Sequence, residues 1–94
     1  MSILLVATMQ VKDADKLAQY REAVGPMVRA QGGELVVKAQ KLTDLKGISA
    51  EGSLMIFRFA DEATFRGWWD SAEYAEITPL RDAGADGVFT LYTE

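Results

Sequence analysis

The sequence contains neither cysteine nor histidine among its 94 residues. Without cysteine there can be no disulfide, no thiolate nucleophile and no zinc–sulfur site. Without histidine, the most common general base and transition-metal ligand are both missing. Only carboxylates could hold a metal, and no dense Asp/Glu ligand loop is present. We therefore expect no metal site and no resident cofactor, and a haem-binding role is disfavoured because only Tyr or Met could be an axial ligand.

Long apolar runs and basic clusters are also missing. The net charge is −4, and the ten Lys and Arg residues are scattered along the chain, so nucleic acid is not an expected partner. The apolar start over residues 1–7 lacks a basic segment and a cleavage pattern, and no stretch approaches the roughly 18 apolar residues that span a bilayer. We expect a cytoplasmic protein with no membrane partner.

What is present is an ordinary globular composition, with 49% hydrophobic and 26% charged residues. A chain of this length forms one domain, which we place over residues 1–94. Four apolar stretches are typical of β-strands, over residues 2–11, 34–41, 54–59 and 88–92. The first is apolar on both faces, which predicts that both are covered. In the second, alternation predicts Leu35, Val37 and Ala39 on one face.

Helices are predicted between these strands, from apolar residues at three- and four-residue steps. Their predicted capping residues are Asp13, Asp61 and Ser71. Pro26 predicts a bend or break in the first helix, and Gly32–Gly33 its end. Gly84 and Gly87 predict a break before the last strand, and residues 43–52 a loop, with or without an irregular edge strand.

The resulting order, βαββαβ, predicts a ferredoxin-like α+β fold. Two right-handed crossovers give a four-stranded antiparallel sheet with the helices on one face. The other face would carry Leu4, Val6, Leu54 and Ile56 and would have no cover from the same chain. An exposed apolar face needs a partner, and a second copy packed sheet to sheet is the simplest one. The sequence therefore predicts a homodimer.

Several segments together resemble a known family. They are Glu51–Gly52, Phe57–Arg58–Phe59, Leu80–Arg81 and above all Trp68–Trp69–Asp70–Ser71–Ala72–Glu73–Tyr74, with Tyr20, Pro26 and Gly32–Gly33 upstream. This pattern resembles the family called domain of unknown function 1330. The resemblance implies a dimeric α+β barrel, a fold that also serves cofactor-independent monooxygenases, muconolactone isomerases and haem proteins. Two positions depart from the family pattern, Arg58 in place of a frequent glutamate and Ala72 in place of a frequent proline.

Tyr74 and Arg81 are the first candidate site residues. They lie seven positions apart, two helical turns, and so share a face. A phenol and a guanidinium in one cleft could bind a carboxylate or an enolate. The alternative is that Tyr74 packs in the core while Arg81 pairs with Asp82 or Glu73.

Arg58 is the second candidate. It falls on the strand face assigned to the dimer interior, where it could anchor an anionic ligand. The alternative is a salt bridge, with Glu51 or across the dimer, because a buried arginine is rarely left unpaired.

The remaining candidates have stronger structural alternatives. Trp68 and Trp69 are expected in the core, although adjacent helical positions diverge by about 100°, so one of them could face a pocket. Tyr20 could close the pocket mouth or simply pack. Ser71 is expected to cap a helix, since no histidine exists to activate it. Glu51 fits a turn, or a carboxylate facing a ligand.

These residues predict a small-molecule-binding homodimer with a pocket between helices and sheet. Arg58, Tyr74 and Arg81 would orient an anionic, carbonyl or aromatic ligand. The residue set restricts any catalysis to cofactor-independent proton transfer or oxygenase-type chemistry. The alternative is a non-catalytic structural or interaction module, with the two tryptophans filling the pocket.

Overall fold

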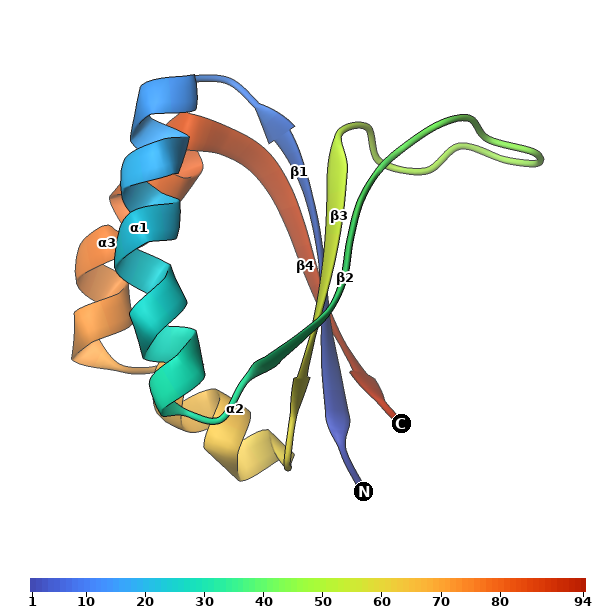
Figure 1. The fold of residues 1–94 in the computed structure, drawn as a ribbon. Coiled ribbons are helices and arrows are strands. Elements are labelled where there is room, and N and C mark those ends of the chain that lie inside the picture. The colour runs from blue at the N-terminus through green and yellow to red at the C-terminus, as the bar shows by residue number, and fades with distance from the viewer.

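The computed structural model describes residues 1–94 as a four-stranded antiparallel sheet with three helices on one of its faces (Figure 1). The elements are β1 (Ile3–Val11), α1 (Ala14–Ala30), β2 (Glu34–Gln40), β3 (Ser53–Phe59), α2 (Glu62–Trp69), α3 (Ala72–Gly84) and β4 (Ala85–Thr93). The strand order is β2-β3-β1-β4, which confirms the predicted ferredoxin-like arrangement. No helix combines the length and the apolar character that crossing a bilayer requires.

The core lies between the helices and one face of the sheet. Strand β1 alternates strictly, and its residues on this face are buried. They are Ile3, Leu5, Ala7 and Met9. The helices cover them with Leu17, Tyr20, Val28, Phe65, Trp68 and Tyr74. Aromatic rings make up much of this layer, and Phe59 stacks on Trp68 with ring centroids 5.9 Å apart.

Each helix begins at the predicted capping residue. The Asp13 carboxylate accepts hydrogen bonds from the backbone N–H groups of Asp15 and Lys16 at 3.1 Å. Asp61 accepts from the N–H of Thr64 at 2.7 Å, and Ser71 caps α3. These bonds satisfy amide groups that the first helical turn leaves without partners.

Of the bend or break predicted at Pro26, the break was wrong, because α1 continues through Pro26 to Ala30. Proline removes one backbone donor, but Tyr20 before it and Val28 after it are both buried against the sheet. Tertiary packing of one apolar face therefore outweighs the local cost. The helix ends as predicted, with Gly32 at a φ of 75°.

The predicted alternation of β2 was also wrong. A β-bulge shifts the register between Leu35 and Val37, so Leu35 pairs with Phe57 while Val37 pairs with Ile56. Leu35 therefore faces the helices, whereas Val37 and Ala39 point away from them. The same shift turns Lys38 toward the helices.

Of the two glycines near the C-terminus, Gly84 ends α3 as predicted, whereas the break predicted at Gly87 was wrong. Strand β4 follows α3 directly, and Gly87 lies inside it. Gly84 allows α3 to touch α1, since a Cβ there would lie 2.7 Å from the backbone nitrogen of Leu17. Its carbonyl also accepts hydrogen bonds from Lys12 and Asp13 at 2.8 and 3.1 Å. At Gly87, the ring of Phe89 covers the place of the missing side chain.

The second face of the sheet carries no helix (Figure 1). Leu4, Val6, Leu54 and Ile56 lie on it and are partly exposed, as the sequence predicts for a single protomer. The two ends of the chain meet beside this face, where the backbone N–H of Glu94 donates to the Ser2 carbonyl at 2.9 Å. We call this surface the open sheet face.

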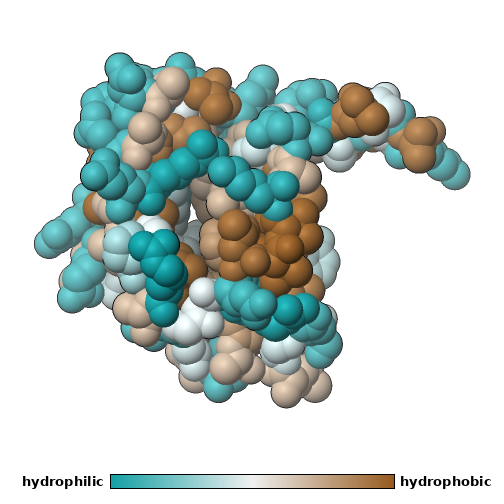
Figure 2. Space-filling model, viewed as in Figure 1, coloured by the Kyte–Doolittle hydropathy of each residue, from teal (hydrophilic) through white to brown (hydrophobic).

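The loop over residues 41–52 projects from the sheet as an arm (Figure 1). Lys41 at its base pairs with Asp44 at 2.7 Å and with Glu51 at 2.9 Å. Apolar side chains along the arm are 95–98% exposed, and Figure 2 shows them as brown atoms on the projecting segment. They are Leu42, Leu45 and Ile48.

Candidate functional site

A cavity lies between α1 and the sheet. Its inner part measures about 50 Å³ and continues into an outer cleft of about 420 Å³. Arg21, Val24, Val28, Met55 and Phe57 line both parts, so the two form one site. Figure 2 shows the hollow that opens between α1 and the edge of the sheet.

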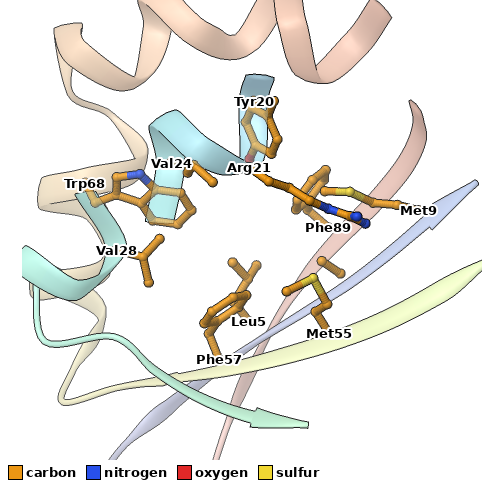
Figure 3. A pocket seen from close by; sticks show the side chains of 11 residues that line it. Leu5, Met9, Tyr20, Arg21, Val24, Val28, Met55, Phe57, Trp68 and Phe89 are labelled. Carbon is orange, nitrogen blue, oxygen red and sulfur yellow. The ribbon is translucent and has the colours of Figure 1, made fainter. Parts of the chain in front are cut away.

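The inner cavity is almost entirely apolar. Strands β1, β3 and β4 form its floor, and α1 and Trp68 of α2 close the other side (Figure 3). The floor residues are Leu5, Ala7, Met9, Met55, Phe57 and Phe89. Such a lining suits an apolar or aromatic group, with orientation set by the few polar atoms nearby.

Three polar side chains form a chain behind this wall. The hydroxyl oxygens of Tyr20 and Tyr74 lie 2.8 Å apart, and Nη1 of Arg81 donates to the Tyr74 oxygen at 3.1 Å. Arg81 also pairs with Asp82 at 3.0 Å, and its guanidinium lies over the Trp69 ring. Tyr74 and Arg81 meet as their seven-residue spacing predicts, but only Tyr20 lines the cavity itself.

This row of three hydrogen-bonded side chains leaves one tyrosine hydroxyl hydrogen without an acceptor in the protein. Arginine can only donate, so the Tyr74 oxygen accepts from Arg81, and the two tyrosines share a single hydrogen bond. When Tyr74 donates to Tyr20, the hydrogen of Tyr20 is free. A second donor is also unpaired, because Nε1 of Trp68 is buried with no hydrogen-bond partner.

Tyr20 stays protonated at neutral pH. Burial raises its pKa far above the ordinary value of 10.0, and the neighbouring Tyr74 raises it further, while Arg81 acts in the opposite direction. Tyr20 is therefore a hydrogen-bond donor and not a base. Such a donor can stabilise a carbonyl oxygen or the negative charge that develops on it.

The outer cleft has a basic mouth formed by Arg21, Arg29 and Lys38. No acidic residue lines the cavity or the cleft, and none of these three side chains forms a salt bridge. None of the three was among the site residues predicted from the sequence. The positions of two of them could have indicated a shared site. Arg21 and Arg29 lie eight residues apart, on the same flank of the apolar stripe of α1.

Arg58 lies on the open sheet face, on the opposite side of the sheet from the cavity. It donates two hydrogen bonds of 2.7 Å to Glu94, and Glu34 lies 3.9 Å away. Hydrogen bonds from Arg58 and Ser2 lower the pKa of Glu94 from 4.5 to about 2. The structure thus does not bring Arg58 together with Tyr74 and Arg81, and it shows a salt bridge with Glu94 in place of the expected Glu51.

Of the other predicted site residues, some line the cavity and others lie away from it. Trp68 lines the cavity, while Trp69 stacks on Phe65 with ring centroids 5.6 Å apart and lies outside it. Ser71 accepts from the backbone N–H of Tyr74 at 3.1 Å, which is its capping bond. Glu51 pairs with Lys41 at the base of the arm. No cluster of three or more acidic side chains lies close enough to bind a metal ion.

Comparison with known proteins identifies similar folds. The model of the domain of unknown function (DUF1330) matches residues 2–93. RPA0582 of Rhodopseudomonas palustris, of unknown function, is 19% identical with a TM-score of 0.86, over 99% of this chain and 82% of that one. SnoaB, a cofactor-independent oxygenase from Streptomyces nogalater, is 15% identical with a TM-score of 0.72, over 99% and 92%.

A dimeric ferredoxin-like protein of unknown function from Thermobifida fusca is 17% identical with a TM-score of 0.63, over 100% of this chain and 92% of that one. No curated protein matches the sequence. At these identities the similarity to solved structures shows a shared fold and nothing more.

Proposed function

Since the chain belongs to the DUF1330 family, whose description assigns no activity, we propose that it is a homodimer that binds a small anionic or carbonyl-bearing molecule between α1 and the sheet. The observation that carries this proposal is an apolar cavity lined by Tyr20 and Trp68, where the indole nitrogen of Trp68 has no hydrogen-bond partner and the Tyr20–Tyr74 pair has one hydroxyl hydrogen more than it has acceptors. A buried donor without an acceptor costs about 1–3 kcal/mol. A ligand oxygen would remove that cost.

Catalysis at this site would be free of cofactors. Protonated Tyr20 could stabilise the oxygen of an enolate, which supports proton transfer or oxygenase-type chemistry on an enolisable ligand. The description of SnoaB as a cofactor-independent oxygenase supports the same proposal for this fold. No carboxylate lines the cavity, so the chain itself supplies no evident base there.

A non-catalytic interaction protein is the second candidate. The small inner volume of about 50 Å³ favours it, because an inner cavity of that size holds little more than water. In that case the outer cleft would bind no small molecule.

Binding can be tested with methyl naphthyl ketone, a neutral aromatic carbonyl compound. In a proton–nitrogen NMR titration, the indole N–H signal of Trp68 should shift downfield as it gains an acceptor. The Trp69 indole lies outside the cavity and serves as an internal control. Tyr20→Phe should weaken binding by about fivefold, which corresponds to one hydrogen bond of about 1 kcal/mol. No shift at saturating ketone would favour the second candidate.

The open sheet face supports the proposed homodimer. Its apolar residues have no cover within one chain, and the exposed apolar side chains of the arm add to the surface that a second copy would bury. A two-fold pairing of identical sheets would cover both copies at once.

Sedimentation at about 10 µM should therefore report twice the protomer mass. Ile56→Asp, which places a charge at the centre of the open sheet face, should reduce it to one protomer with its circular dichroism retained. Ala18→Asp, on the exposed side of α1, is the matched control and should remain dimeric. A wild-type protein that sediments as a single protomer would contradict the dimer.

A further inference from the structure

The mouth of the outer cleft carries only positive charges, although the protein as a whole has a net negative charge. The protein has 14 acidic and 10 basic residues, yet the cleft and cavity are lined by three basic side chains and no acidic one. Arg21, Arg29 and Lys38 are exposed and form no salt bridge. Three neighbouring cations repel one another, so an anion at this place would be favoured.

Local backbone features bring two of these charges to the cleft. A Cβ on Gly25 would lie 3.2 Å from Nη1 of Arg29, so the glycine leaves room for the guanidinium against α1. Lys38 reaches the cleft side of the sheet only because the bulge between Leu35 and Val37 reverses the alternation of β2. Without the bulge, Lys38 would point to the open sheet face.

The floor next to these charges is apolar. Val24, Val28, Met55 and Phe57 line both the outer cleft and the inner cavity, so an apolar body can lie along them while an acidic group stays at the mouth. A volume of about 420 Å³ is within the range of about 300–1,000 Å³ that is typical of small-molecule sites.

We propose that the ligand of this cleft is an amphipathic carboxylate, with a ring-sized apolar body on the floor and its carboxylate held at the mouth by Arg21, Arg29 and Lys38. This inference rests on the proposed binding function and adds the ligand class to it. Arginine suits the carboxylate because its planar donors can bind both oxygens. Tyr20 and Trp68, which carry hydrogen-bond donors, line the inner cavity and are a separate contact.

The test compares naphthoate with methyl naphthyl ketone, which share an aromatic body and differ in charge. The triple variant Arg21→Gln, Arg29→Gln, Lys38→Gln should weaken naphthoate binding by about tenfold, since each exposed charge pair contributes about two- to fivefold at most. Ketone binding should change by less than about twofold. The difference in naphthoate affinity between the wild-type protein and this triple variant should shrink as salt is added.

The matched control is the triple variant Lys12→Gln, Lys16→Gln, Lys46→Gln, which makes the same change in net charge away from the cleft. It should leave both affinities within about twofold, and both triple variants should keep the wild-type unfolding midpoint. The carboxylate class would be overturned if the wild-type protein bound the two compounds with equal affinity. It would also be overturned if the two triple variants lost naphthoate affinity equally. Either result would leave the binding function standing. Failure of both compounds to bind would overturn both proposals.

Discussion

Replacing Tyr74 by phenylalanine tests the polar chain behind the cavity. Tyr74 is 1% exposed, and its hydroxyl bonds to Tyr20 at 2.8 Å and accepts from Arg81 at 3.1 Å. The variant loses a neutral hydrogen bond worth about 1 kcal/mol and a charge-assisted one worth about 1.5–3 kcal/mol. The second loss is reduced because Arg81 keeps Asp82 and part of its hydration. We expect the free energy of unfolding to fall by about 2–3 kcal/mol.

The assay is urea unfolding followed by far-ultraviolet circular dichroism, at one fixed protein concentration because association would shift the midpoint. The double variant Tyr20→Phe, Tyr74→Phe removes the donor that the single variant leaves unpaired. Its loss should be about 1 kcal/mol smaller than the sum of the two single losses. Gln19→Ala, at an exposed position on α1, is the control and should change stability by less than about 0.5 kcal/mol. The reasoning would be refuted if Tyr74→Phe lowered the free energy of unfolding no more than this control does. It would also be refuted if the loss in the double variant equalled the sum of the two single losses.

Three further predictions concern other parts of the molecule. Gly84→Ala should lower the free energy of unfolding by about 3 kcal/mol in thermal unfolding, because the new methyl group would meet the backbone of Leu17; a loss under about 1 kcal/mol would count against that close approach. Above about pH 10 the unfolded chain loses the Tyr20 proton that the folded chain keeps, so wild-type stability should fall with rising pH by up to about 1.4 kcal/mol per pH unit more than that of Tyr20→Phe. Arg58→Gln should return the pKa of Glu94 from about 2 toward 4.5 in an NMR titration, so the stability that wild type loses between pH 4.5 and 2 should be smaller in the variant; an unchanged pKa would contradict the salt bridge as its cause.

The sequence predicted best those features that depend on near neighbours. Asp13 and Ser71 cap their helices through bonds that span two or three residues, so the residues involved are adjacent in the chain. The meeting of Tyr74 and Arg81 follows from helix geometry alone. The two faces of β1 followed from strict alternation, and with them the open sheet face.

Features that depend on contacts between distant segments were not predicted. The continuity of α1 through Pro26 depends on the sheet beneath it, and the role of Gly84 depends on the approach of α1 to α3. The bulge in β2 is defined by pairing with β3, so sequence alternation could not place Lys38 on the side of the helices, and the basic mouth was missed. Arg58 was placed correctly on the open sheet face, but its partner, Glu94, is 36 positions away.

The contact between Ser2 and Glu94 has a topological consequence. Because these residues are hydrogen-bonded neighbours, a linker of a few residues would turn this chain into a ring without moving any strand. The ring could then be reopened in the arm, near Leu45, where the backbone takes no part in strand pairing. A circular permutant of this kind would start with β3 and finish with β2, yet it would keep all three ladders and every residue that lines the outer cleft.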